Sequence, residues 1–141
     1  MIPKFRAWDK TQEIMIDYII SIDFIKKIIT YDYEDSLDLT VRFDDVILMQ
    51  STGLTDMNGV EIYEGDIVRT FSNINKYTDP WMSDSEPEYE LSIIVRSGAC
   101  FMTTYKGDPS EPLDFTVSSM AKHLEVIGNI YENKELLEDK Q

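Results

Sequence analysis

Cysteine and histidine are nearly absent from this sequence of 141 residues, which has one Cys, Cys100, and one His, His123. A single Cys excludes an intrachain disulfide and any zinc or iron–sulfur site that needs several cysteines. Cys100 sits in the apolar run 99–102, so we expect a buried and inert thiol. A Cys100–His123 dyad has no supporting motif around the Cys, and a single Cys fits a reducing compartment.

Motifs of catalysis and nucleotide binding are also missing. The sequence has no Gly-x-Ser-x-Gly elbow, no Gly-x-Gly-x-x-Gly and no Walker loop. The stretch Asp56–Glu61 lacks the third oxygen ligand and the in-register Glu of a calcium loop. The acids Asp108, Glu111 and Asp114, and those of 79–90, have no His or Cys among them. We therefore predict no catalytic, cofactor-binding or metal-binding residues, and no enzyme.

Basic residues are scarce relative to acidic ones. Lys and Arg number 13 against 27 Asp and Glu, which gives a formal net charge of -14. Affinity for nucleic acid comes mainly from Lys and Arg that displace counterions from phosphates, so direct binding of DNA or RNA is not expected. An acidic surface could instead mimic nucleic acid and inhibit a DNA-binding protein, or simply keep the protein soluble.

Long hydrophobic runs are lacking too. The longest apolar stretches are Tyr18–Ile20 and Val46–Met49, far below the ~20 residues that cross a bilayer. The N-terminus has no apolar segment typical of a secretory signal. We expect a soluble, cytoplasmic protein that forms a single domain over residues 1–141, with no membrane partner.

The N-terminal third has the patterns of β-strands. Residues 5–8 and 13–16 predict a hairpin with a four-residue connection, and residues 37–43 alternate as a half-buried strand. The many Ile residues of 18–25 favour a strand. Because Phe24, Ile25, Ile28 and Ile29 would also share one helical face, strand and helix both stay open for 18–29.

The middle of the chain mixes turns and strands. Residues 43–49 could hold a helical turn introduced by Asp44 or Asp45. Residues 50–59 are polar and end in Asn58–Gly59, a strong signal for a tight turn. A turn at Gly65–Asp66 then precedes a β-branched run at 67–71, which we predict to be a strand.

The second half begins with an acidic loop over 78–90, which has two prolines and five acids and is expected to form no regular element. Trp81 could anchor this loop on the body of the protein or on a partner. The remaining predictions are a hairpin of strands at 89–95 and 99–105, a loop at 107–112, strands at 115–120 and 124–127, and a closing helical turn at 134–138 capped by Asn133.

Three stretches together resemble the YopX family of phage and prophage proteins: Lys4–Asp9, Met49–Val68 and Val126–Asn133. The residues that carry the resemblance are Trp8, Gln50, Thr52, Gly53, Asp56, Gly59, Tyr63, Gly65, Asp66, Gly128, Asn129 and Tyr131. The resemblance implies a mainly β (β-rich α+β) protein with a small SH3-like barrel, its core at about 53–131, an N-terminal hairpin and a short C-terminal helical turn. It implies self-association in the cytoplasm of a host bacterial cell, but no activity and no cofactor.

These residues also have structural interpretations. The glycines suit backbone geometry, Trp8, Tyr63 and Tyr131 suit packing, and Asp56 and Asp66 suit turns or caps. The leading hypothesis is a non-enzymatic accessory module that forms a homo-oligomer and binds a host or phage protein. Its contact is expected at the N-terminal hairpin, through Phe5, Trp8, Ile14 and Ile16, or at Leu136–Leu137. The alternatives are an acidic mimic of nucleic acid and an enzyme with an unrecognised site.

Overall fold

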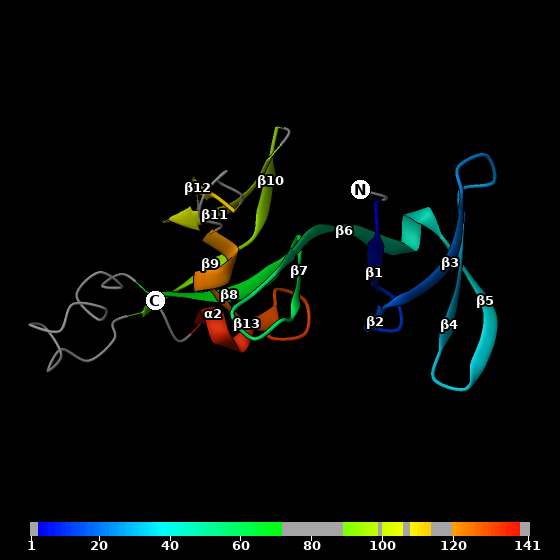
Figure 1. Ribbon diagram of the computed structural model, residues 1–141. Helices are drawn as coiled ribbons and strands as arrows, with labels where there is room; N and C mark the ends of the chain where they lie inside the picture. Colours follow the sequence, from blue (N-terminus) through cyan, green and yellow to red (C-terminus); the bar gives the residue numbers. More distant parts are fainter. Residues whose placement is uncertain (1–2, 72–88, 99, 106–107, 114–119, 139–141) are drawn as a thin grey trace, which may run out of the picture. The chain divides into compact units, whose positions relative to one another are not determined.

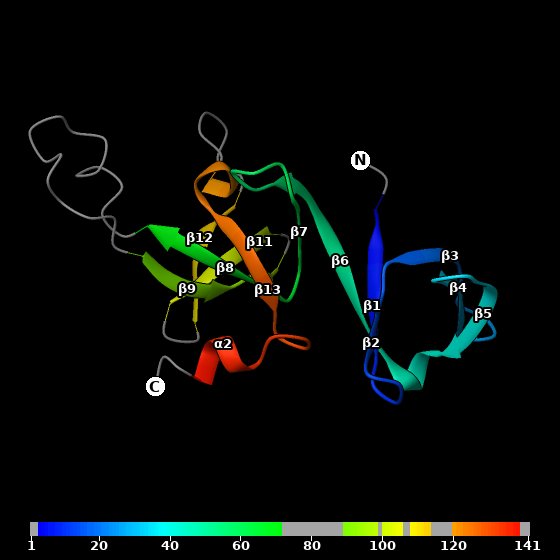
Figure 2. The same ribbon diagram turned by 90° about the horizontal axis from the view of Figure 1, so that it is seen from below.

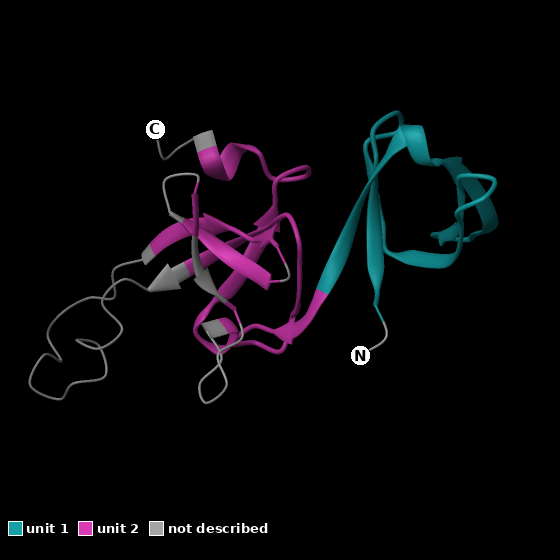
Figure 3. Ribbon diagram, turned by 90° about the horizontal axis from the view of Figure 1, so that it is seen from above, with its two compact units in different colours: residues 1–51 teal, residues 52–141 magenta. Residues whose placement is uncertain are grey.

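The computed structural model describes residues 3–71, 89–98, 100–105, 108–113 and 120–138. The chain divides into two compact units, residues 1–51 and residues 52–141 (Figure 3). Within these residues nearly all elements are β-strands, and a short α-helix, α2 (Glu135–Glu138), lies near the C-terminus. The predicted mainly β fold with a short C-terminal helical turn is confirmed. The expected barrel core, 53–131, falls within the second unit.

The first unit starts with the predicted hairpin. Strand β1 (Phe5–Asp9) pairs antiparallel with β2 (Ile14–Ile16) and, on its other side, with the first half of β6 (Val46–Thr55). A separate sheet has the order β3 (Tyr18–Asp23), β4 (Ile28–Tyr33), β5 (Ser36–Arg42) (Figure 1). Residues 18–23 are therefore strand, and Phe24–Lys27 form the turn that follows it.

The core of the first unit is apolar and small. It consists of Ala7, Ile16, Ile29, Tyr31 and Val46, with Ile19, Ile22, Leu39 and Val41 packed against it. Ile16 is fully buried there, so the expectation that it lies exposed on the hairpin is wrong, because the hairpin uses that side chain to cover its own core. Phe5, Trp8 and Ile14 are half-buried.

The second unit begins within β6, whose last residues, from Thr52 on, belong to it. Next come β7 (Glu61–Tyr63), β8 (Asp66–Phe71), β9 (Tyr89–Ile93), β10 (Val95–Ser97), β11 (Cys100–Tyr105), β12 (Asp108–Pro112) and β13 (Glu125–Asn129). Two sheets have the orders β13-β8-β9 and β10-β11-β12, and the strands of this unit curl into a half-barrel (Figure 2). Its core consists of Ile62, Val68, Ile94, Leu113, Ala121 and Leu124.

Among the described residues, two short 3-10 helices interrupt the strands: η1 (Phe43–Asp45) and η3 (Met120–His123). The predicted helical turn at 43–49 is thus limited to 43–45, and no side chain caps its start. Beyond it, Val46–Met49 belong to β6, which continues through the mostly polar residues 50–55, where Ser51 and Thr52 are buried. The turn follows at 57–59, as Asn58–Gly59 predicted.

Four further expectations are wrong for identifiable reasons. Residues 108–112 form a strand rather than a loop; β12 is an edge strand, where proline costs no ladder hydrogen bond on the open side. Leu37 is 70% exposed rather than half-buried, because it precedes Asp38, whose φ of 54° accompanies an irregularity in the β4–β5 register. Cys100 is exposed, since it starts β11 beside the turn at Gly98.

The fourth concerns Asn133, whose side-chain oxygen accepts a hydrogen bond from the backbone N–H of Asn129 (3.0 Å) instead of capping α2. The acidic loop at 78–88, including Trp81, and the predicted strand at 115–119 lie outside the described residues, and Tyr89 and Glu90 already belong to β9. In the described part of the chain, no helix has the length and hydropathy of a membrane span.

Candidate interaction surface

Asp56, one of the residues that carry the family resemblance, organises the turn after β6. Asp56 is 4% exposed, and its carboxylate accepts three backbone hydrogen bonds. Oδ1 accepts from the N–H of Asn58 (2.8 Å) and of Val60 (2.9 Å), and Oδ2 accepts from the N–H of Val126 in β13 (2.8 Å). A short carboxylate side chain is suited to both tasks, because it closes the turn locally and still reaches a distant strand.

A second network surrounds Gly65 and Asp66. Asp66 Oδ2 accepts from the N–H of Tyr63 (2.7 Å), which closes the turn between β7 and β8. The carbonyl of Gly65, at a φ of 89°, accepts from the N–H of Ile130 (3.0 Å). Asn129 lies opposite Asp66 in the β13–β8 ladder, so the two turns are fixed to each other.

Asn129 shapes the next turn itself. Its Oδ1 accepts from the N–H groups of Tyr131 (3.0 Å) and Glu132 (2.8 Å), and the carboxylate of Glu132 accepts from its side-chain amide (2.9 Å). A side chain at Gly128 would meet Asn133, because an added Cβ would lie 2.5 Å from Asn133 Oδ1. Glycine is therefore needed there for space.

The remaining residues of the resemblance have simpler places. Thr52 is buried; its hydroxyl donates to the carbonyl of Ile62 (2.7 Å) and accepts from the N–H of Leu54 (3.1 Å). Gly53 and Gly59 have φ values of 77° and 81°, which favour glycine. Half-buried positions are occupied by Trp8 in β1, Gln50 in β6, Tyr63 in β7 and Tyr131 after β13.

Ten of the twelve residues thus belong to the second unit, where they hold turns and strands together; Trp8 and Gln50 belong to the first. The oxygens of Asp56 and Asp66 accept backbone N–H groups, a structural use of a carboxylate. Cys100 and His123 are both exposed, and the described residues contain no group of three metal-ligating side chains. The residues of the family resemblance therefore have structural roles, and the candidates for binding are exposed side chains elsewhere on the surface.

Large apolar side chains are exposed on the sheet of the first unit. Tyr18 (74%), Ile20 (53%), Phe24 (71%), Ile25 (94%) and Leu37 (70%) all belong to β3, β5 or the β3–β4 turn. In β3 an irregular register between Ile19 and Ser21 leaves Ile20 facing solvent. Exposed apolar surface of this kind is typical of interaction sites where the side chains adjoin.

The β3–β4 turn, Phe24–Lys27, is held in a defined shape. Asp23 Oδ1 accepts from the N–H of Ile25 (3.0 Å) and of Lys26 (2.9 Å), and the carbonyl of Lys27 accepts from the N–H of Phe43 (3.0 Å). The rings of Phe24 and Phe43 meet edge to face with centroids 5.9 Å apart. We call this turn the tip. It presents exposed apolar side chains on an ordered backbone.

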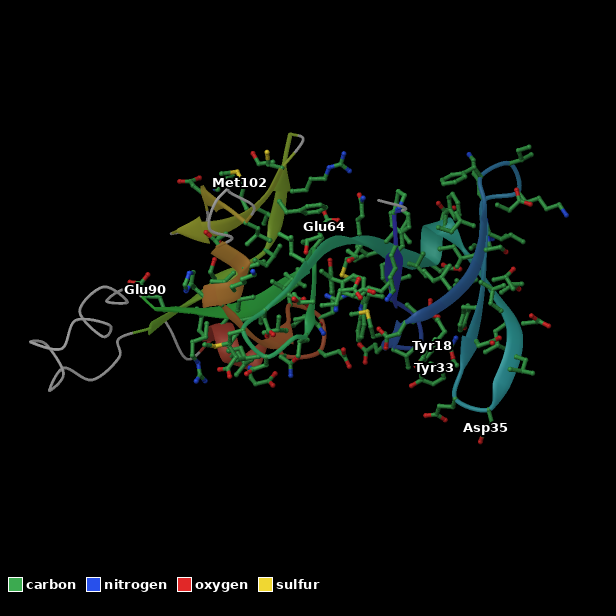
Figure 4. The ribbon with its side chains drawn as sticks, in the orientation of Figure 1. Tyr18, Tyr33, Asp35, Glu64, Glu90 and Met102 are labelled. Carbon is green, nitrogen blue, oxygen red and sulfur yellow. The ribbon has the colours of Figure 1, made fainter. Side chains whose placement is uncertain are left out.

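A concavity of about 590 Å³ lies within the same unit, along β3 from Tyr18 to Ile22. It is lined by apolar residues of β1 and β3, among them Phe5, Tyr18 and Ile20, and by the charged residues Lys4, Asp17 and Asp32. Figure 4 shows Tyr18 and Tyr33 toward the same end of the β3–β4–β5 sheet, with Asp35 at the turn beyond. The volume is within the ~300–1,000 Å³ of ordinary binding sites.

Sequence reasoning missed both features. The pattern of 18–29 left strand and helix open, and neither interpretation predicts a turn at Phe24 and Ile25. The signal that could have found the tip is Asp23 followed by a Lys pair, since Asp closes a turn onto the next two or three N–H groups. The concavity had no signal of its own, because it depends on the placement of β1 beside β3.

Comparisons with known proteins agree with this fold. The chain is similar to the crystal structure of protein EF1440 from Enterococcus faecalis, with 28% sequence identity and a TM-score of 0.63. The match covers 97% of this chain and 99% of that one. No curated protein matches the sequence. The model of the family described as YopX protein matches residues 4–138, a range that includes both compact units, and the chain therefore belongs to the YopX family.

Proposed function

We propose that this chain is a phage- or prophage-encoded accessory protein that works as a non-enzymatic, self-assembling interaction module in the cytoplasm of its bacterial host. The observation that carries the proposal is the set of exposed apolar side chains on the β3–β5 sheet. Such a surface is costly in water unless another molecule covers it. A further host or phage protein could bind the assembled module.

The contact must overcome electrostatic repulsion. Each copy has a formal net charge of -14, so two copies repel one another over about 10 Å at ~0.1 M salt. An interface with an apolar centre suits these conditions, since added salt weakens the repulsion and leaves burial of apolar area intact. Self-association is therefore expected to strengthen as salt is raised.

The absence of catalysis is part of the proposal. Its support is that Asp56 and Asp66, the two carboxylates among the residues of the family resemblance, are buried and accept backbone N–H groups. The Cys100–His123 dyad considered above gains no support, because both side chains are exposed and they belong to different elements, β11 and η3.

Light scattering after size exclusion tests self-assembly. At tens of micromolar we expect a mass that is a multiple of 16.4 kDa, with a larger oligomeric fraction in high salt than in low salt. A particle near 16.4 kDa under both conditions would show that the module does not assemble, and the proposal would fail.

A further inference from the structure

The concavity is bounded by two runs of consecutive residues. Its lining consists of Pro3–Phe5 at the start of β1, Asp17–Ile22 along β3, and Asp32, which lies opposite Tyr18 in β4. The face of a sheet presents alternate residues of a strand, whereas the edge of a strand presents every residue. The lining is therefore formed in large part by two strand edges rather than by the face of one sheet.

The hairpin of β1 and β2 opens where the concavity begins. The pairing of the two strands ends at Ala7 and Ile16. The same register, continued by two residues, would place Phe5 opposite Tyr18, but Tyr18 begins β3 and pairs with Asp32 of β4. Figure 2 shows β3 turning away from β1. The concavity is thus the wedge between two strands that separate.

Both walls present the open side of a strand. Successive residues of a strand direct their backbone groups to opposite sides. Because the carbonyl of Lys4 accepts from the N–H of Ser51 (2.7 Å) on the β6 side, the backbone groups of Phe5 face the side of β2, which ends at Ile16. In the described part of the chain, β3 is the edge strand of its sheet and has β4 on its paired side. An open edge is a template for the addition of another strand.

We propose that the concavity binds an extended, basic segment of a partner protein, which adds as a strand along the edge of β3. Main-chain hydrogen bonds hold such a segment, and Tyr18 (74% exposed) and Ile20 (53%) offer apolar contacts to its alternate side chains. The stretch Tyr18–Ile22 accommodates ~16 Å of extended chain. The inference rests on the interaction module proposed above and names the chemistry of its partner, but it does not require self-assembly.

Charge favours a basic segment. The lining includes the carboxylates of Asp17 and Asp32 and the ammonium group of Lys4. Glu34 and Asp35 follow in the β4–β5 turn, at the same end of the sheet as Asp32. The first unit as a whole has 10 acidic and 6 basic residues. A cationic segment is therefore attracted, whereas an anionic segment or a second copy of this acidic chain is repelled.

Fluorescence anisotropy with two short peptides tests the assignment. The probe is KVTVTVK-amide, which has alternate β-branched apolar side chains and a cation at each end; EVTVTVE-amide is its anionic counterpart, and both have the same N-terminal fluorophore. KVTVTVK should bind the wild type saturably below ~1 mM, and EVTVTVE should bind at least ~10-fold more weakly at low salt. No saturable binding of KVTVTVK, or equal binding of the two peptides, would refute the inference.

Variants of the protein locate the bound peptide. Ile20→Lys places a cation on the apolar wall at an exposed position that the fold does not need, and it should weaken KVTVTVK binding at least ~10-fold. Val60→Lys is the matched control: it adds the same charge at a half-exposed apolar position of the second unit and should bind like the wild type. Asp32→Asn, which keeps an oxygen for the N–H of Asp38, should weaken binding ~3-fold at low salt and less at high salt. Equal binding by Ile20→Lys and Val60→Lys would place the peptide elsewhere and overturn the inference.

Backbone pairing has a readout of its own. N-methylation of the three valines of KVTVTVK blocks the N–H groups on one edge of the peptide, and N-methylation of its two threonines blocks those on the other edge. At least one of these two copies should bind ~10-fold more weakly or worse, because it cannot donate to the strand edge. Unmodified KVTVTVK should also slow hydrogen exchange in β3. Full affinity of both methylated copies, or no added protection of β3, would show that the peptide does not add as a strand.

Light scattering on the same samples separates this inference from self-assembly. A monomeric wild type that binds KVTVTVK would remove self-assembly and leave the inference standing. An oligomer that binds no peptide would keep self-assembly and refute the inference. If Ile20→Lys dissociates the oligomer and Val60→Lys does not, a second copy occupies the concavity, and the inference is overturned.

Discussion

Removal of the Asp56 carboxylate is expected to destabilise the second unit by about 3 kcal/mol. Asp56→Ala deletes the acceptor for the N–H groups of Asn58, Val60 and Val126. Hydrogen bonds to a charged group contribute ~1.5–3 kcal/mol each when a buried partner is left unsatisfied. Asn58 and Val60 lie in an exposed turn where water can replace the carboxylate, so they add ~0.5–1 kcal/mol each, and the Val126 N–H in β13 supplies the rest.

Hydrogen exchange measured by mass spectrometry reports this loss locally. A loss of about 3 kcal/mol corresponds to ~150-fold faster exchange of the slowest amides in β7, β8 and β13. Peptides from residues 3–51 should change much less, because Asp56 belongs to the other compact unit. The exchange rates of Asp56→Asn should lie between those of the wild type and those of Asp56→Ala. The amide keeps one acceptor oxygen but places an N–H donor where the second oxygen was.

Asp23→Ala is the control for this reasoning. Asp23 also accepts two backbone N–H groups, of Ile25 and Lys26, but in an exposed turn. Its loss should cost only ~0.5–1 kcal/mol, as for other exposed caps. Equal effects of Asp56→Ala and Asp23→Ala, or an Asp56→Ala loss below ~1 kcal/mol, would refute the argument that burial and the long-range bond to β13 decide the magnitude.

Three further predictions need simpler measurements. Gly128→Ala should cost ~1–3 kcal/mol in urea unfolding because its Cβ meets Asn133, whereas Gly98→Ala, with nothing within 4 Å, should cost only the ~1 kcal/mol of its positive φ; equal losses would contradict this. Cys100, being exposed, should react with a thiol reagent in the native protein as fast as in urea, and a protected thiol would show that it is covered. At physiological salt we expect no binding of duplex DNA in an anisotropy titration, and micromolar, salt-sensitive affinity would contradict this.

The sequence predicts those parts of the fold in which local pattern and burial agree. The hairpin of β1 and β2, the Asn58–Gly59 turn and the strand predicted at 67–71, observed as β8 (Asp66–Phe71), each have a local signal strong enough to identify them. The prolines at 109 and 112 argued against a strand at 108–112. They are tolerated there because β12 lies at the edge of its sheet, which the sequence alone does not indicate. Cys100 and Leu37 were misjudged because position in a turn or at an irregular register decides exposure as much as hydropathy does.

The candidate surface was less accessible to such reasoning. Apolar residues are normally assigned to the core, so the sequence did not predict the exposure of Phe24 and Ile25. Their exposure depends on where β3 ends and on the closing of the turn by Asp23. The concavity is lined by residues of β1 and β3 and by Asp32 of β4. No local sequence pattern encodes this tertiary arrangement.

The bond from Asp56 to Val126 joins residues 70 positions apart, which has a consequence for the order of folding in the cell. The strand pairings of the first unit lie within residues 1–51. All the strands that pair there are therefore synthesised before the second unit is made. At ~5–20 residues per second, the ribosome takes about 4–14 s to make the 70 residues between Asp56 and its partner strand. During that interval β13, which pairs with one side of β8, has not yet been made. The first unit can therefore fold while the second is still incomplete.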